Sequence, residues 1–347
     1  MKRKHSISAQ RSLSDNPKSK ITNPKWVGAF AFVIAFIMCG AVGAQPTKIP
    51  RIGFLSALNP DAVPTWLVAF RQGLREHGYV EGKNIVIEWR YAEGKLDRLP
   101  SLANELVNLK VDVIVSGGPA VTRAAKKVPT TIPIVMGFDN DPVGSGFVAS
   151  LAQPGGNITG LSNYAPEMSG KRLELLKEIV PRLSRVAVLG TSTQPGNAQM
   201  LKETELAAGA FGVKLQYLDV LSAKDIDSVF RAANNGRADA ILMLSIPFVL
   251  SHRTQIANLA AKSRLPAIYS QPENTEAGGL MYYGANTPDL FRRAATYVDK
   301  ILKGRTPADL PVEQPKKFEF IINLKAAKQI GLTIPPNVLV RADRVIR

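Results

Sequence analysis

Short apolar runs alternate with amphipathic stretches along the chain from Pro50 onward, and few folds accommodate this alternation. An apolar run of four or five residues indicates a buried strand, whereas apolar residues at intervals of three and four indicate a helix. Leu67, Phe70 and Leu74, for example, lie on one side of a predicted helix. Strands separated by helices are typical of parallel sheets. The first elements, starting with a strand and alternating, are expected at 52–55, 63–77, 84–89, 99–109, 111–115, 120–127 and 134–136.

The alternation begins a second time after residue 167. Because 347 residues exceed what one hydrophobic core usually supports, the repetition predicts two lobes. The second set, starting with a helix, is expected at 167–180, 186–189, 197–211, 213–220, 223–233, 240–244, 249–262 and 266–270.

Further elements follow the second set and predict several passages between the lobes. They are a helix at 288–302, a strand at 318–322, a short helix at 324–330 and a strand-like piece at 338–341. We place three crossings near 157–161, 281–286 and 310–315. The predicted class is α/β, with two doubly wound parallel-sheet lobes joined by three crossings. The predicted division is 1–44 as a signal peptide, 45–159 plus 281–309 as lobe one, and 160–280 plus 310–347 as lobe two.

The first 44 residues have the pattern of a secretory signal peptide. A basic segment precedes an uncharged, mainly apolar stretch, 26–45, that ends in small residues. We expect cleavage after Ala44 and export to the periplasm. An uncleaved membrane anchor is the alternative, because about 19 mostly apolar residues can span a bilayer. A lipid anchor through Cys39 is disfavoured, since Met38 stands where such an anchor requires a small residue.

Charge and composition exclude several classes of function. Residues 1–44 contain seven basic residues and one acid, so the net charge of +16 falls to +10 (16 − 6) after cleavage. The remaining basic residues are scattered, which does not favour nucleic acid as a partner. Cys39 is the single cysteine, and His5, His77 and His252 are far apart, so no His- or Cys-based metal site is expected. No nucleophile elbow or phosphate-binding loop is present, and we expect neither a cofactor nor catalysis.

Seven short stretches match the pattern of one known family. The string at 151–162, LAQPGGNITGLS, is the most specific of them, and the others are RIGFL at 51–55, DPV at 141–143, KRLELL at 171–176, GGLM at 278–281, LPVEQP at 310–315 and FEFIINLK at 318–325. With these stretches the chain resembles the exported ABC-transporter substrate-binding proteins of the aromatic-amino-acid (tryptophan/tyrosine) type.

The resemblance implies a periplasmic binding protein of type I architecture. Such a protein would close on a small ligand, for instance an amino acid, and deliver it to an ABC permease in the inner membrane. Two other functions remain open at this point: an exported hydrolase or racemase on a two-lobed α/β fold, and a ligand sensor for a membrane receptor. An enzyme would need paired acid and base groups across the cleft, and the sequence offers carboxylates without His or Cys partners.

Polar residues that follow predicted strands are the candidate ligand contacts, because open α/β sheets bind ligands at the carboxyl ends of their strands. Two turns precede helices and suit a carboxylate, although the same residue types also serve as plain caps. The two turns contain Ser116, Gly117 and Gly118 in lobe one, and Thr191 and Ser192 in lobe two.

Carboxyl and amide groups offer partners for a ligand ammonium. Asp139 and Asn140 follow the strand at 134–136. Ser245 follows the strand at 240–244 of lobe two, and the end of the next strand carries Tyr269, Gln271 and Glu273. All four are expected to face Asp139 and Asn140 across the cleft. Trp66 and Trp89 are assigned to the core or the surface.

Overall fold

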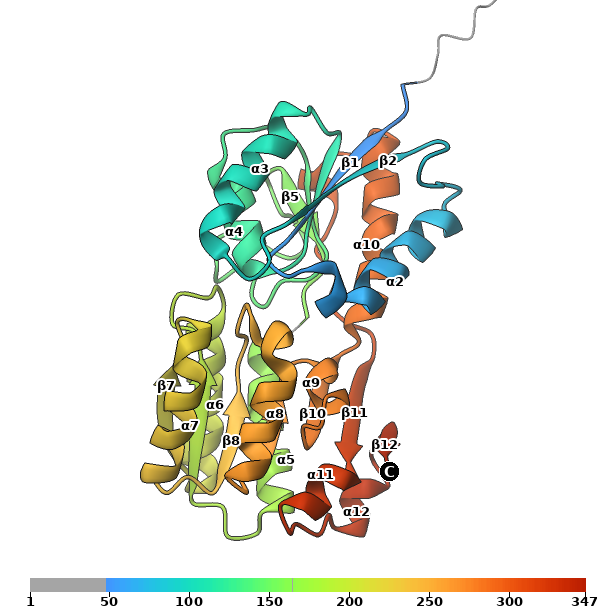
Figure 1. Ribbon diagram of the computed structural model, residues 1–347. Helices are drawn as coiled ribbons and strands as arrows, with labels where there is room; N and C mark the ends of the chain where they lie inside the picture. The colour runs from blue at the N-terminus through green and yellow to red at the C-terminus, as the bar shows by residue number, and fades with distance from the viewer. Residues whose placement is uncertain (1–47, 164) are drawn as a thin grey trace, which may run out of the picture. The chain divides into compact units, whose positions relative to one another are not determined.

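The computed structural model describes residues 48–163 and 165–347, which contain two sheets with helices on their faces (Figure 1). The predicted signal peptide, residues 1–44, lies outside the described residues. No helix within the described ranges is both long and apolar enough to cross a membrane. Residues Ile49–Arg347 form one compact unit that holds both sheets.

The first sheet has five parallel strands in the order β2-β1-β3-β4-β5. Its strands are β1 (Arg51–Ser56), β2 (Val86–Tyr91), β3 (Val113–Ser116), β4 (Ile134–Met136) and β5 (Ile158–Gly160). Helices α3 (Leu99–Asn108) and α4 (Pro119–Lys127) cover one face, and α2 (Pro64–Glu76) and α10 (Thr287–Leu302) cover the other (Figure 1). Short 3-10 turns lie at η1 (Pro60–Ala62), η2 (Leu96–Arg98) and η5 (Pro307–Asp309).

Helix α10 returns to the first lobe from late in the sequence, as predicted, and a glycine permits its close packing. A Cβ atom at Gly73 of α2 would lie 2.1 Å from the carbonyl oxygen of Arg292 in α10. Only a residue without a side chain allows the two helix backbones to approach this closely.

The second sheet has seven strands in the order β12-β11-β10-β9-β8-β6-β7. All its pairs are parallel except β10–β11. The strands are β6 (Arg185–Gly190), β7 (Lys214–Asp219), β8 (Ala240–Met243), β9 (Ala267–Tyr269), β10 (Met281–Ala285), β11 (Phe318–Asn323) and β12 (Arg344–Ile346). The helices and 3-10 turns are α5 (Ala165–Ile179), α6 (Asn197–Phe211), η3 (Ala223–Asp225), α7 (Ile226–Asn235), η4 (Val249–His252), α8 (Arg253–Lys262), α9 (Pro272–Glu276), α11 (Leu324–Gln329) and α12 (Pro336–Leu339).

The α/β class with two doubly wound lobes is confirmed, but three local predictions differ from the structure. Residues 158–160, placed in the first crossing, form β5 and pair with β4 in the first sheet, so by sheet membership the first passage begins after Gly160. Residues 336–339 form α12, not a strand, because Pro336 occupies the first helical position, and the strand lies at β12. Strand β10 pairs within the second sheet, so by sheet membership the second passage begins after Ala285, not at Met281. The exact lobe boundaries otherwise stay a prediction.

Three chain segments connect the lobes. The first follows β5, the second joins β10 to α10, and the third lies between η5 and β11. The first and third lie side by side, because Leu161 forms a bridge with Glu313 and the amide of Ser162 donates to the carbonyl oxygen of Glu313.

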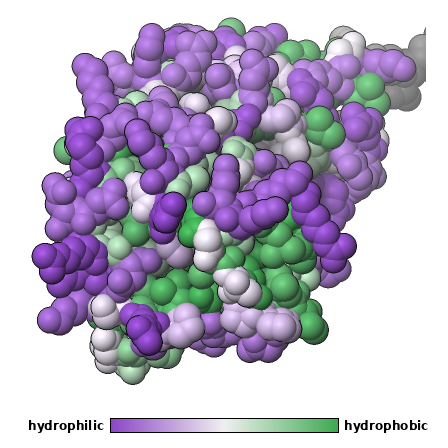
Figure 2. Space-filling model, turned by 60° about the horizontal axis from the view of Figure 1, so that its bottom comes forward, coloured by the Kyte–Doolittle hydropathy of each residue, from purple (hydrophilic) through white to green (hydrophobic). Residues whose placement is uncertain are grey.

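Hydrophobic side chains form the core on both faces of each sheet, and a central strand such as β8, covered by helices on both sides, is apolar and buried along its whole length. Figure 2 shows the outer surface from another side: hydrophilic residues cover most of this face, and an apolar area lies in its lower part. Some exposed apolar surface of this kind is usual for a folded protein.

Candidate ligand-binding site

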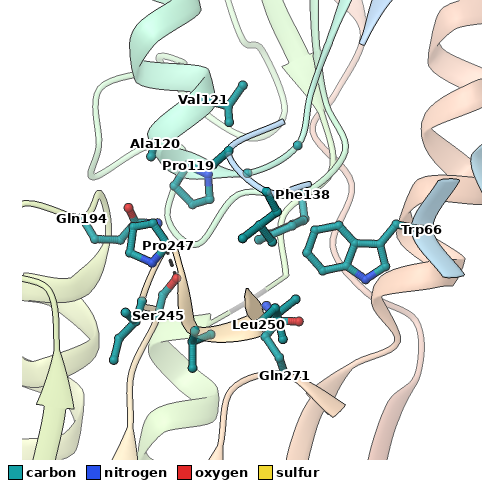
Figure 3. A pocket seen from close by; sticks show the side chains of 16 residues that line it. Trp66, Pro119, Ala120, Val121, Phe138, Gln194, Ser245, Pro247, Leu250 and Gln271 are labelled. Carbon is teal, nitrogen blue, oxygen red and sulfur yellow. Dashed lines mark hydrogen bonds between the residues drawn. The ribbon is translucent and has the colours of Figure 1, made fainter. Parts of the chain in front are cut away.

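A pocket with an empty volume of about 420 Å³, partly open to solvent, lies between the two lobes (Figure 3). It is bordered by the carboxyl ends of strands from both sheets, the position at which open α/β sheets bind ligands. Its lining residues from the first lobe are Ala57, Leu58, Trp66, Gly117, Gly118, Pro119, Ala120, Val121 and Phe138, and those from the second lobe are Gln194, Ser245, Ile246, Pro247, Val249, Leu250 and Gln271.

The turn between β3 and α4 forms one wall of the pocket. Gly118 has a φ of +132°, and a Cβ atom there would lie 3.2 Å from the Phe138 ring. A glycine therefore permits both this backbone conformation and the close approach of the ring. Ser116 lies behind the turn, where its hydroxyl contacts Thr122 Oγ1 at 2.6 Å. Pro119 then begins α4, so the positive end of the helix dipole borders the pocket.

An aromatic cluster holds Trp66 at the pocket. The Trp66 ring stacks on Phe291, with ring centroids 5.1 Å apart and planes at 17°. Phe138 meets it edge-on at 5.5 Å. Both Trp66 and Phe138 line the pocket, and Figure 3 shows their rings side by side. Because neighbouring rings fix the indole, it offers a rigid apolar surface to a ligand.

The wall from the second lobe combines apolar residues with amide and hydroxyl groups. Gln194 Nε2 lies 3.5 Å from Ser245 Oγ, as the dashed line in Figure 3 shows. Asn197 supports both loops, since its Nδ2 donates to the carbonyl oxygens of Thr191 at 2.9 Å and Ser245 at 2.7 Å. The third polar group, Gln271, follows β9.

Hydrogen bonds cross from one lobe to the other around the pocket and show a closed arrangement, and Thr287 Oγ1 of α10, for example, donates to Gln271 Oε1 at 3.4 Å. Arg123 Nη1 donates to the carbonyl oxygen of Thr193 at 2.5 Å, and Asn140 Nδ2 donates to that of Pro195 at 3.2 Å. Trp66 Nε1 donates to Glu273 Oε1 at 2.9 Å. Lobes that touch around a pocket are the arrangement in which a two-lobed protein encloses its ligand.

Among residues 48–163 and 165–347, no charged side chain lines the pocket, although two buried carboxyl groups lie just behind its walls. Burial raises the pKa of Asp139 to about 8 and that of Glu273 to about 7. One oxygen of each, Asp139 Oδ2 and Glu273 Oε2, has no hydrogen-bond partner within the described part of the chain. A neutral Asp139 near pH 7 avoids the large penalty of a buried unpaired charge.

The structure brings four of the eleven predicted contacts to the pocket and places the others around it. Gly117, Gly118, Ser245 and Gln271 line the pocket. Asn140 and Glu273 form hydrogen bonds between the lobes. Ser116, Asp139, Thr191 and Tyr269 are buried behind the walls, and Ser192 is exposed and hydrogen-bonded to Asp219.

The apolar lining residues were absent from the predicted set. Trp66 was assigned to the core or the surface, yet it is both a core residue and a pocket wall. Gln194, Pro247 and Leu250 follow strands β6 and β8 at the carboxyl edge, which is the signal that identifies them. As for metals, no cluster of His, Cys, Asp or Glu in the described ranges has the geometry of a binding site.

Two lobes that meet around an apolar pocket at their strand ends define the class of two-lobed solute-binding proteins. The chain belongs to the ABC transporter substrate binding protein family, whose pattern it matches over residues 51–346. The predicted family is thereby confirmed, and binding of a small solute for transport follows from it.

Individual relatives support this assignment. The tyrosine-binding protein of Clostridioides difficile strain R20291 is 25% identical over 285 residues, 82% of each chain. A solved conserved domain protein of Vibrio cholerae O1 biovar El Tor N16961 is 29% identical with a TM-score of 0.81, covering 86% of this chain and all of the other. The ABC domain from Streptococcus pneumonia, solved in complex with L-Trp, is 26% identical with a TM-score of 0.80, covering 86% and 99%.

Proposed function

We propose that this protein binds an aromatic amino acid, or a ligand of similar shape without net charge, in the pocket between its lobes. The observation that carries the proposal is the pairing of two aromatic rings, Trp66 and Phe138, in a pocket wall that holds no charged side chain. An aromatic ring gains from stacking and edge contacts with such walls, in addition to burial of its apolar surface.

The polar groups of the pocket suit the two ends of an amino acid. The amino end of α4, after Gly117 and Gly118, favours a carboxylate. Oxygen atoms of Gln194, Ser245 and Gln271 can accept from an ammonium group. A ligand with an unbalanced charge would lose its hydration without gaining a counter-ion, and it should bind poorly.

The tyrosine-binding relative and the L-Trp complex support an aromatic amino acid. We further propose that the signal peptide directs export to the periplasm, that an ABC permease in the inner membrane receives the ligand, and that the protein catalyses no reaction. Of the predicted contacts, Gly117, Gly118, Ser245 and Gln271 are those we propose to touch the ligand directly.

A screen of the twenty amino acids by thermal shift, followed by calorimetry, tests this function. A ligand at 100 times its Kd should stabilise the protein by about 2.7 kcal/mol. Gln194→Ala should weaken binding about five- to tenfold, the effect of one lost hydrogen bond, whereas Gln199→Ala on α6, outside the pocket lining, is the matched control. Absence of a shift with every aromatic amino acid would exclude this ligand class.

A further inference from the structure

One hydrogen bond joins the pocket wall of the first lobe to the opposite lobe. Trp66 lies on α2, and its Nε1 donates to Oε1 of Glu273 on α9, 207 residues further along the chain. Both side chains are buried, with 3% and 8% of their surface exposed. Because the Trp66 ring also lines the pocket, a single side chain contacts both the ligand space and the far lobe.

The direction of the Trp66 N–H is fixed by the first lobe alone. Phe291 stacks on the indole and Phe138 holds its edge, and both belong to first-lobe elements. Glu273 is held separately by α9, which packs on α8, β9 and β10 of the second lobe. The donor and the acceptor therefore meet only when the two lobes are together.

The closed arrangement removes Glu273 from water with little compensation. Its Oε2 has no hydrogen-bond partner, and it forms no ion pair with any residue of the described ranges. The charged or titratable groups that act on it are Glu276 of α9, Arg253 of α8 and Tyr282 of β10. An ionised carboxylate whose donors are only its own backbone N–H and the Trp66 N–H is costly in such a place, and we expect opening of the lobes to return it to water.

We infer that Trp66 and Glu273 form a proton-dependent latch, in which Glu273 takes up a proton as the lobes close. The inference rests on the proposed closing of the lobes, but not on the identity of the ligand. Acid should favour the closed form, and ligand affinity should rise with it.

The direction of the pH effect follows from the pKa of Glu273. In the closed form burial raises this pKa to about 7, whereas a carboxyl group in water has a pKa of about 4.3. At pH values between about 4.3 and 7, Glu273 is therefore protonated in the closed form and ionised in the open form. The stabilisation of the closed form by this proton is complete below about pH 4.3 and is lost as the pH rises through 7. Between pH 8 and pH 5 the ratio of closed to open molecules should rise at least about tenfold.

Asp139 is the other buried carboxyl group near the cleft, and it does not account for this effect. The groups that act on its pKa, Thr122, Asn140 and Asp141, all belong to the first lobe. Separation of the lobes removes none of these three groups, and Glu273→Gln leaves Asp139 in place, so this variant separates the contributions of the two carboxyl groups.

Distances between spin labels on the two lobes test the latch without a ligand. Lys127→Cys on α4 and Lys202→Cys on α6 place labels at exposed positions of different lobes, in the full chain carrying Cys39→Ser. We expect the short-distance population of the otherwise unaltered protein to grow at least about tenfold, relative to the long one, between pH 8 and pH 5. A ratio that does not change with pH would overturn the inference.

Three substitutions sharpen the test. Glu273→Gln should remove the pH dependence, whereas Glu276→Gln, an exposed residue on the same helix, should keep it. Trp66→Phe retains the stacked ring and removes the N–H, so it should reduce closure mainly at pH 8, where the anion loses its donor. Retention of the full pH dependence in Glu273→Gln, or unaltered closure at both pH values in Trp66→Phe, would contradict the latch.

Calorimetry at pH 6 with L-tryptophan, in two buffers of different ionisation enthalpy, counts the protons taken up on binding. We expect close to one proton for the unaltered protein and close to none for Glu273→Gln. Equal uptake by both would overturn the inference. Absence of L-tryptophan binding would count against the proposed ligand only, because the label distances still decide the latch.

Discussion

Replacement of Gly196 by alanine tests whether the closed arrangement described here is the one that binds ligand. Gly196 precedes α6 in the second lobe with a φ of +81°, and a Cβ atom there would lie 2.7 Å from Cβ of Asn140 in the first lobe. Real Cβ atoms essentially never approach within 3.0 Å, and ordinary contact begins at 3.4 Å. The lobes must therefore separate here by about 0.7 Å (3.4 − 2.7) to accommodate the methyl group.

The cost of this separation can be worked out from the neighbouring contacts. Asn140 Nδ2 donates to the carbonyl oxygen of Pro195 at 3.2 Å, and the added separation breaks this bond. One such bond is worth about 0.5–1.5 kcal/mol, and the loosened van der Waals contacts add to it. We expect closure to lose about 1.4 kcal/mol, which lowers ligand affinity about tenfold.

Backbone strain is a separate effect, and Gly212 provides its control. Gly212 follows the other end of α6 with a φ of +65°, and nothing lies within 4 Å of a Cβ atom there. Alanine in this backbone region costs about 1–2 kcal/mol at either position. Urea denaturation should show this loss in both variants, and calorimetry should show weaker binding in Gly196→Ala alone. Equal affinity in the two variants would refute the reasoning.

Three further predictions concern packing, pH and ligand charge. Gly73→Ala should destabilise the protein by about 1–3 kcal/mol in urea denaturation, because its Cβ would lie 2.1 Å from the Arg292 carbonyl oxygen, and an unchanged midpoint would argue against this α2–α10 packing. For Asp139 the folded-state pKa of about 8 exceeds the unfolded value of about 3.9, so the protein should lose stability as the pH rises from 4 to 8, and Asp139→Asn should remove that slope. Parallel slopes of stability against pH in the unaltered protein and in Asp139→Asn would show that Asp139 stays in water in the folded state. L-Lysine and L-glutamate should bind at least about tenfold more weakly than L-phenylalanine in a competition assay, since the described residues that line the pocket include no charged side chain, and comparable affinities would contradict that description.

Periodicity alone predicts most of the architecture. Most apolar runs become strands and most amphipathic stretches become helices, because local spacing decides which side chains can be buried together. The helix that returns to the first lobe is predictable for the same reason. The errors lie where long-range pairing decides the structure. Strand β10 joins the second sheet through partners on both sides, and β12, with only three residues, has too little apolar pattern of its own.

The candidate site is less predictable, because ligand walls and core have the same residue types. Gly117, Gly118, Ser245 and Gln271 follow strands at the carboxyl edge, so their position is read from local pattern. The spacing of apolar residues allows Trp66 to be buried, but it does not show that part of its ring borders a pocket. That pocket exists only because the second lobe lies opposite and supplies its other wall.

Apart from Trp66 and Gln271, the pocket walls and the side chains that bond between the lobes are different residues, and this division has a functional consequence. The carboxyl group of Glu273 and the side-chain amide of Asn140 form hydrogen bonds across the cleft and do not line the pocket. A change in a wall residue alters the fit of one ligand relative to another. A change in an interlobe contact alters the closing equilibrium, which every ligand shares, and so it scales all affinities by one factor. Affinities of several amino acids should therefore fall together in Gly196→Ala and change their order in Gln194→Ala.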